Sequence, residues 1–350
     1  MAPPHLVTDR STFYQTAQEA SVGDRIPVEA RLTVEDPFEA YRRARHSSGG
    51  CYLETGGGTE GWSYFGVDPI EFVTADPGDA LADLFARLHG EHLYRGDCSI
   101  PYPCGAIGWL SYDIAREIES LPDSAQRDRA LPRLQVGLYD TLVAWREPAE
   151  SPVTLHITAC PTLGDDHEST FERGRDRALA LANRIIEGDR RIHSPERRPV
   201  RFESTCGREA FMDRVERVKT HIREGETFQA NISHRLRASA GVHPVETFGA
   251  LRERNPAPYS GLMEFPDADL VSASPELLLD AEGKDLLTEP IAGTRGRGDT
   301  PEEDDQLREA LLESEKEHAE HAMLVDLERN DLGKVAEYGS VEVTDYRRID

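Results

Sequence analysis

The chain has 350 residues, enough for one large or two ordinary domains with a sizeable core. Its formal net charge of −25 argues against nucleic acid or an anionic membrane surface as a partner. No apolar run is long enough to span a membrane, and the first residues lack the pattern of a signal peptide. The five cysteines are scattered without a C-x-x-C pair, so we expect a protein of the reducing cytoplasm.

Lysine is scarce in this sequence, whereas arginine is abundant. The four lysines are Lys219, Lys284, Lys316 and Lys334. Many acidic residues with few lysines are typical of proteins from salt-rich cytoplasms, where ionic strength screens the self-repulsion. A GC-rich genome also favours Arg over Lys, and this alternative stays open. It does not by itself require so many Asp and Glu residues, so the composition favours adaptation to salt.

Periodicity predicts helices and strands that alternate through the first half of the chain. The predicted helices are 11–19, 36–44, 80–88 and 169–186, and the predicted strands are 26–34, 51–55, 61–69, 135–145 and 153–158. Residues 105–113 are predicted to form a core strand that runs into a helix. The Gly-rich turn 56–58 could cradle a phosphate, but no dinucleotide or Walker pattern follows, which favours a hairpin loop. On the helix 80–88 the large apolar side chains, Phe85 among them, are predicted to face inward.

A change of composition marks a boundary near the middle of the chain. Residues 187–203 are rich in arginine, contain two prolines and show no period, so we expect a surface linker. It divides the chain into a domain 1–190 and a domain 200–350. After the linker, a predicted helix ends at Gly225, and residues 227–235 alternate apolar and polar side chains. This alternation predicts a strand with one polar face.

A turn near residue 293 is the first candidate for binding a ligand. Pro290 and Gly293 mark the turn, which can bring the Gly293 N–H and the Thr294 hydroxyl close to a small anion. Arg295 and Arg297 follow and are expected to add positive charge there.

An acidic helix is the second candidate. Thr300 is a strong N-cap, and on the helix that follows Glu313, Glu317, Glu320 and Leu324 fall on one face. Three carboxylates on one face repel each other unless a cation lies among them, and oxygen ligands suit Mg²⁺ better than zinc. In so acidic a chain, a solvated acidic face is the alternative, and the residues alone favour it.

Two long motifs in this region resemble those of a known family. They are Pro290-Ile-Ala-Gly-Thr-Arg295 and Glu320-His-Ala-Met-Leu-Val-Asp-Leu-Glu-Arg-Asn-Asp-Leu-Gly333. The family is that of the chorismate-utilising enzymes, which includes the large subunits (component I) of anthranilate synthase and aminodeoxychorismate synthase. Shorter matches extend the resemblance upstream.

The resemblance implies a two-lobed α+β fold with antiparallel sheets flanked by helices. Residues 1–190 would form the N-terminal domain, and residues 200–350 the first part of the chorismate-binding domain. Further motifs that the family carries downstream do not occur in the sequence. We therefore expect a sequence that lacks the C-terminal part of this domain, either because it is a fragment or because the rest comes from another polypeptide.

The resemblance also implies roles for three glutamates. Glu317 and Glu320 would hold Mg²⁺, which binds the ring carboxylate of chorismate. Glu276 and Glu317 would be catalytic residues, with Glu276 as the acid that protonates the departing hydroxyl.

Four further residues would contact the substrate, namely Gln229, Ala292, Gly293 and Thr294. Family members that add water carry a lysine as general base at the position of Gln229. Glutamine cannot take that role, so the chain resembles the members that add ammonia. No glutaminase nucleophile motif is present, which implies a separate glutamine amidotransferase subunit as partner.

The motifs do not agree on which product the enzyme forms from chorismate. Ala292 is typical of anthranilate synthases, because many aminodeoxychorismate synthases carry a lysine there. The segments 229–231 and 255–261, and the departure at Leu53-Glu54-Thr55 from the tryptophan feedback pocket, favour aminodeoxychorismate synthase, in the p-aminobenzoate and folate branch. The alternatives are anthranilate synthase, in the tryptophan branch, and an inactive binding or regulatory partner.

Overall fold

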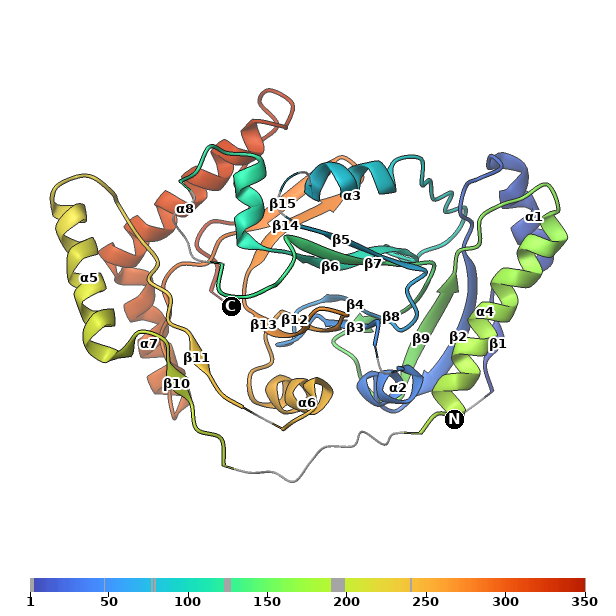
Figure 1. The fold of residues 1–350 in the computed structure, drawn as a ribbon, viewed down its shortest axis with the longest axis horizontal. Coiled ribbons are helices and arrows are strands. Elements are labelled where there is room, and N and C mark those ends of the chain that lie inside the picture. Colours follow the sequence, from blue (N-terminus) through green and yellow to red (C-terminus); the bar gives the residue numbers. More distant parts are fainter. Residues whose placement is uncertain are drawn as a thin grey trace.

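The computed structural model describes residues 3–46, 48–76, 78, 80–122, 127–189, 199–239 and 241–349. These residues form a mixed α+β fold with antiparallel sheets and flanking helices, as the sequence predicts (Figure 1). None of the described helices is both long and apolar enough to cross a membrane.

An eight-stranded antiparallel sheet is the largest element of the fold. Its spatial order is β1 (His5–Leu6), β2 (Val28–Val34), β9 (Val153–Ala159), β8 (Thr141–Glu147), β4 (Gly61–Gly66), β3 (Gly50–Glu54), β12 (Tyr259–Glu264) and β13 (Asp269–Ser274). β12 pairs with β3, so the sheet includes strands from both sides of the predicted domain boundary. The division into 1–190 and 200–350 stays a prediction, and residues 190–198 of the expected linker lie outside the described residues.

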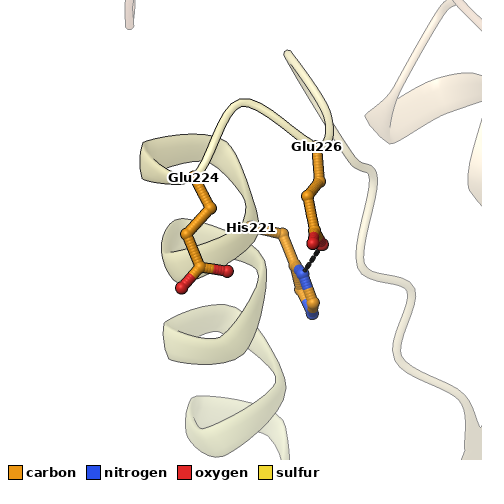
Figure 2. A group of neighbouring side chains, drawn as sticks. All are labelled: His221, Glu224 and Glu226. Carbon is orange, nitrogen blue, oxygen red and sulfur yellow. Dashed lines mark hydrogen bonds and ion pairs between the residues drawn. The ribbon is translucent and has the colours of Figure 1, made fainter.

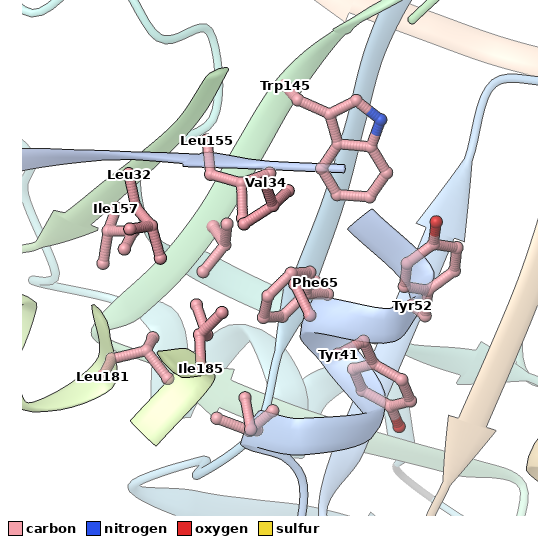
Figure 3. Packing of buried hydrophobic residues seen from close by; sticks show 14 of the residues in the cluster. Leu32, Val34, Tyr41, Tyr52, Phe65, Trp145, Leu155, Ile157, Leu181 and Ile185 are labelled. Carbon is pink, nitrogen blue, oxygen red and sulfur yellow. The ribbon is translucent and has the colours of Figure 1, made fainter. Parts of the chain in front are cut away.

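The main hydrophobic core lies between this sheet and its helices. The helices are α2 (Pro37–Ala44), α4 (His167–Glu187) and α6 (Pro244–Arg254), while α1 (Arg10–Glu19) packs beside α4. Figure 3 shows the packing, in which Tyr41, Tyr52, Phe65 and Trp145 are fully buried. The rings of Tyr52 and Phe65 are stacked, and the other ring contacts among the four are edge-to-face or tilted. Burying one such side chain contributes roughly 1.5–3 kcal/mol, so this cluster accounts for much of the stability.

A three-stranded sheet lies beside the larger one. Its order is β5 (Glu71–Ala75), β7 (Leu134–Tyr139) and β6 (Gly105–Leu110), with α3 (Ala80–Leu88) and the 3₁₀ helix η1 (Tyr112–Glu117) against it. The prediction of one strand over 135–145 is wrong, because the chain passes from this sheet to the larger one at Asp140. Residues 134–140 are all buried, so no polar residue exposed to solvent marks the corner.

Two other local predictions are also wrong. Phe85 is 65% exposed, because the short helix α3 presses only a narrow stripe around Leu84 onto the sheet. Residues 227–235 do not form a strand, because the only backbone hydrogen bond given for them to a neighbouring described segment is the one that the Arg235 carbonyl accepts from the Thr205 amide at 3.0 Å.

The remaining elements form a second region, which extends from the left to the upper centre of Figure 1. It contains α5 (Gly207–Arg223), α7 (Pro301–Glu313), α8 (Glu315–Gly333) and two short strand pairs. The pairs are β10 (Glu203–Ser204) with β11 (Leu236–Arg237), and β14 (Leu277–Glu282) with β15 (Asp285–Glu289). None of the three helices has a buried residue.

Candidate active site

The acidic stretch that the sequence predicts as one helix forms two helices. Ser314 ends α7 and caps α8, where its hydroxyl accepts a hydrogen bond from the Glu317 amide at 3.4 Å. Glu313 therefore belongs to α7 and does not share a helical face with Glu317 and Glu320. The three-carboxylate face is reduced to a pair, because a serine cap breaks the helical period that the sequence pattern assumed.

The remaining two carboxylates, those of Glu317 and Glu320, both lie close to the ammonium group of Lys316. The Nζ atom of Lys316 is 3.4 Å from a carboxylate oxygen of Glu317 and 3.4 Å from one of Glu320. The hydrogen bonds to Glu320 and Glu317 raise the pKa of Lys316 above its ordinary value. The Glu317 side chain is only 12% exposed. Sequence reasoning missed Lys316, although its spacing of four residues from Glu320 was a usable signal.

The turn after β15 packs directly against Glu317. Gly293 has a φ of +81°, and a Cβ atom placed there would lie 3.1 Å from Glu317 Cβ and 3.2 Å from Glu317 Oε2. A side chain at this position would be strained and crowded, so glycine permits the close approach. Ala292 is half-buried before it, and Thr294 is exposed after it. The Nη1 atom of Arg295 lies 3.5 Å from Glu317 Oε1.

Glu276 and Gln229 join the same neighbourhood from two other segments. Glu276, just before β14, accepts a hydrogen bond from the Ile291 amide at 2.9 Å, which ties it to the residue preceding Ala292. Gln229 Nε2 donates to Glu320 Oε1 at 2.9 Å. These contacts link segments that lie up to 91 residues apart, and they connect Gln229, Glu320, Glu317 and Gly293 in one group.

Arg297 does not join this group. Its guanidinium makes two hydrogen bonds to Asp304 at 2.8 and 2.7 Å, at the start of α7. The hydrogen bonds from Arg297 and from the Gly298 amide lower the pKa of Asp304 to about 2. Of the two arginines expected beside the turn, only Arg295 therefore faces the glutamate pair.

The chemistry of the pair fits a hard cation. Glu317 and Glu320 offer oxygen donors, and both already face the ammonium group of Lys316. No third carboxylate or imidazole among the described residues extends the pair to a cluster of three. A divalent cation there would need further ligands from a substrate or from water.

Another group of possible metal ligands lies at the end of α5 and was not predicted. Figure 2 shows His221, Glu224 and Glu226, whose ligand atoms lie within 4.8 Å of one another. All three are exposed, and the His221 ring is hydrogen-bonded to Glu226. Exposed groups of this kind are common in so acidic a chain, and the site at α8 does not include them.

The fold and the site define a class: an α+β protein that presents a pair of carboxylates, Glu317 and Glu320, against a turn at Gly293. The sequence model of the chorismate binding enzymes matches residues 49–350. The chain belongs to this family of enzymes.

Individual relatives agree with the family match. The chain is 60% identical to an anthranilate synthase component 1 of Haloarcula marismortui over 349 residues, which cover 98% of this chain and 71% of the relative. It is 34% identical to the aminodeoxychorismate synthase component 1 of Bacillus subtilis over 353 residues, covering 95% and 72%.

A solved structure shows the same fold. The crystal structure of anthranilate synthase component I from Streptococcus pneumoniae TIGR4 has a TM-score of 0.65 and 28% identity. The match covers 83% of this chain and 65% of the other, so the chain spans about two thirds of that protein's length.

Proposed function

We propose that the chain is the large subunit of an anthranilate synthase, which aminates chorismate next to the ring carboxylate. The observation that carries this proposal is the 60% identity to an anthranilate synthase component 1, against 34% for the aminodeoxychorismate synthase. These identities favour anthranilate synthase over aminodeoxychorismate synthase, which the sequence motifs had favoured. Ala292 agrees with them, since it offers no amine that could attack the ring.

The residues of the site divide the work in this proposal. Chorismate is a dianion whose allylic hydroxyl must leave. The Gly293 N–H and the Thr294 hydroxyl bind the substrate, while Arg295 contributes positive charge beside Glu317. Gln229 holds the Glu320 carboxylate in place through its hydrogen bond. Glu276 is exposed at the edge of the turn, where it can deliver a proton to the departing hydroxyl.

Glu317 and Glu320 would hold Mg²⁺, which when bound increases the electron withdrawal of the ring carboxylate. Lys316 lies between the same two carboxylates, so it would have to move towards solvent when the metal binds. Its side chain is 77% exposed, which leaves room for this movement. Before the metal binds, Lys316 neutralises part of the negative charge of Glu317 and Glu320.

Ammonia would come from a separate glutamine amidotransferase. The sequence holds no nucleophile motif for hydrolysing glutamine, and the relatives are described as component 1 of their enzymes. With ammonium salt, activity should not require this partner. With glutamine it should.

The test uses a chimera of the Haloarcula relative in which this chain replaces the part that it matches. The chimera receives chorismate, Mg²⁺ and ammonium salt, without any lyase. Fluorescent anthranilate is the expected product, because this route releases pyruvate on the same subunit. Aminodeoxychorismate alone would support the second candidate, which the Bacillus subtilis relative favours. No product of either kind would favour the inactive partner.

Two variants of the chimera test the metal role. Glu320→Gln removes one of the two proposed ligands and should abolish the magnesium-dependent turnover. Glu315→Gln, on the exposed first turn of the same helix, is the matched control and should keep it. Near-normal turnover of Glu320→Gln at saturating magnesium would contradict the metal role and would favour the alternative of a solvated acidic face.

A further inference from the structure

Three of the five cysteines, which the sequence scatters, lie together in the structure. Cys104 directly precedes β6, and Cys160 directly follows β9. The Sγ atom of Cys160 donates to the Pro103 carbonyl at 3.6 Å, which places this thiol beside the backbone of Cys104, and the two thiols are hydrogen-bonded to each other. Cys98 is near enough to act electrostatically on both. We call Cys98, Cys104 and Cys160 the thiol cluster.

The members of the thiol cluster differ in their exposure to solvent. Cys160 is fully buried, Cys104 is 8% exposed, and Cys98 is partly exposed. All three are free thiols in the structure. Cys104 therefore gives a molecule as small as hydrogen peroxide access to a pair of thiols that is otherwise shielded from solvent.

The surroundings of Cys104 favour its thiolate. The hydrogen bond with Cys160 lowers the pKa of the Cys104 thiol below its ordinary value, although burial acts in the opposite direction. The positive charges of Arg25 and Arg95 lower it further. Arg25 is held in place because its Nη1 atom donates to the Cys160 carbonyl at 3.2 Å and its Nε atom donates to Glu91 at 2.7 Å.

The partner thiol has the opposite character. Burial raises the pKa of Cys160 well above its ordinary value, so this thiol stays protonated. The two neighbours therefore divide into a thiol that ionises readily and a thiol that keeps its proton. The thiolate is the reactive form of cysteine, so an oxidant that reaches the pair should react first at Cys104.

We propose that Cys104 and Cys160 form a site of reversible oxidation, at which hydrogen peroxide converts the two thiols into a disulfide. The Cys104 thiolate attacks one peroxide oxygen and breaks the O–O bond, which leaves a sulfenic acid on Cys104 and releases hydroxide. The proton that Cys104 gave up converts this hydroxide into water.

The second step of the oxidation uses the Cys160 thiol. Its sulfur attacks the Cys104 sulfur, the S–O bond breaks, and the oxygen leaves as a second water with the Cys160 proton. Two electrons have then passed from the two sulfur atoms to the peroxide. A dithiol reductant reverses the reaction by exchange.

The disulfide would connect the two sheets of the first region. Cys104 leads into the three-stranded sheet, whereas Cys160 ends a strand of the larger sheet, and its amide donates at 2.7 Å to the carbonyl of Asp140, where the chain changes sheets. A covalent bond at this junction restricts the unfolded chain and should stabilise the fold. No residue of the candidate site takes part, so the proposal does not depend on the proposed function.

The first experiment maps disulfides in the chain after treatment with hydrogen peroxide. The chain should lose two of its five free thiols, mass spectrometry should find Cys104 linked to Cys160, and dithiothreitol should restore both thiols. Cys104 should react at least about tenfold faster than the fully buried Cys51, because burial raises the pKa of Cys51 to about 12. A bond from Cys98 to either thiol, or oxidation of Cys206 while the cluster stays reduced, would overturn the proposal.

The second experiment separates the roles of the two thiols. Cys160→Ala removes the second thiol, so the sulfenic acid on Cys104 should persist and react with dimedone. In Cys104→Ala, Cys160 should stay reduced. Cys206→Ala is the matched control, because Cys206 lies outside the thiol cluster, and it should form the disulfide as the parent does. Dimedone on Cys160 in Cys104→Ala would contradict the assigned order of the steps. The mapping experiment needs no variant, so it decides the proposal even if an alanine variant does not fold.

The melting temperature tests whether the bond fits the native fold. The oxidised parent and the oxidised Cys206→Ala should both melt at a higher temperature than their reduced forms, measured by circular dichroism. Cys104→Ala should melt at the same temperature with and without peroxide. A lower melting temperature of the oxidised parent would contradict a bridge that the native structure accommodates.

Discussion

The two regions of the molecule differ in how they hold their residues. In the region built on the large sheet, Trp145, Tyr52, Phe65 and their neighbours are fully buried. In the region of α5, α7 and α8, hydrogen bonds and ion pairs position the side chains, and no described residue is buried. Every residue of the candidate site lies in the second region.

The scaffold and the candidate site should therefore respond to different substitutions. In a close-packed core, a substitution that removes side-chain volume lowers the stability of the protein. The glutamate pair at α8 depends on a cap, a glycine turn and a few polar contacts, each of which contributes little energy but sets a position. Substitutions in the first region should therefore change the free energy of unfolding. Those in the second region should change the positions of the site's side chains.

The largest effect is expected for Trp145→Ala. Trp145 is fully buried against Tyr52 and Phe65, so truncation should lower the free energy of unfolding by about 3–5 kcal/mol. Chemical denaturation with circular dichroism measures this change. Leu327→Ala on α8 is the control, because Leu327 is 55% exposed, and it should change stability by less than about 0.5 kcal/mol. Similar losses for both variants would remove the contrast between the regions.

A smaller effect is expected for Tyr41→Phe. The Tyr41 hydroxyl donates to Glu264 at 2.5 Å, and Arg45 Nε donates to the same carboxylate at 2.7 Å, which ties α2 to β12. Losing one donor to this buried carboxylate should cost about 1–3 kcal/mol.

The same variant makes a prediction about pH. Burial and the Glu264 charge raise the pKa of Tyr41 well above its ordinary value of 10.0. The protonated form therefore contributes stability in full below pH 10.0, and this contribution is lost as the pH rises towards the higher value. Tyr41→Phe should show a smaller loss of stability between neutral and strongly alkaline pH than the parent, measured by denaturation at each pH. An unchanged alkaline slope would contradict the assignment.

Ser314→Ala should have an effect of about 1 kcal/mol, the usual contribution of an N-cap. The first turn of α8 would fray, and Glu317 would lose its fixed position beside Gly293. Faster hydrogen exchange of the Glu317 amide is the expected signature. Ser314→Asp keeps a cap and should restore protection, whereas equal exchange in both variants would show that the cap does not hold the helix.

The smallest effect is expected at Asp304. Its pKa of about 2 lies below the ordinary value of 3.8, so its pairing with Arg297 contributes above pH 3.8 and is lost as the pH falls through about 2. Carbon NMR titration of the carboxyl group measures the value directly. Arg297→Gln should move it back towards 3.8, because Arg297 is the largest cause of the shift. An unmoved titration would assign the shift to the Gly298 amide.

The family and most of the local structure could be predicted from the sequence. The motifs at 290–295 and 320–333 indicated the chorismate-utilising enzymes, which the family match confirms. Periodicity predicted helices such as α2, and the N-cap at Thr300 predicted the start of α7, because such signals depend on neighbours within one helical turn. Product choice was less well determined, and the relatives favour anthranilate over the predicted aminodeoxychorismate.

The contacts between distant segments could not be predicted and are known from the three-dimensional structure. It joined β12 to β3 across the predicted boundary, turned the chain at Asp140 between two sheets, and placed Lys316 between Glu317 and Glu320. It also left residues 227–235 without a ladder, although their alternation is that of a strand. The physical reason is that a helix satisfies its backbone within one segment, whereas a strand needs a partner that no local pattern can supply.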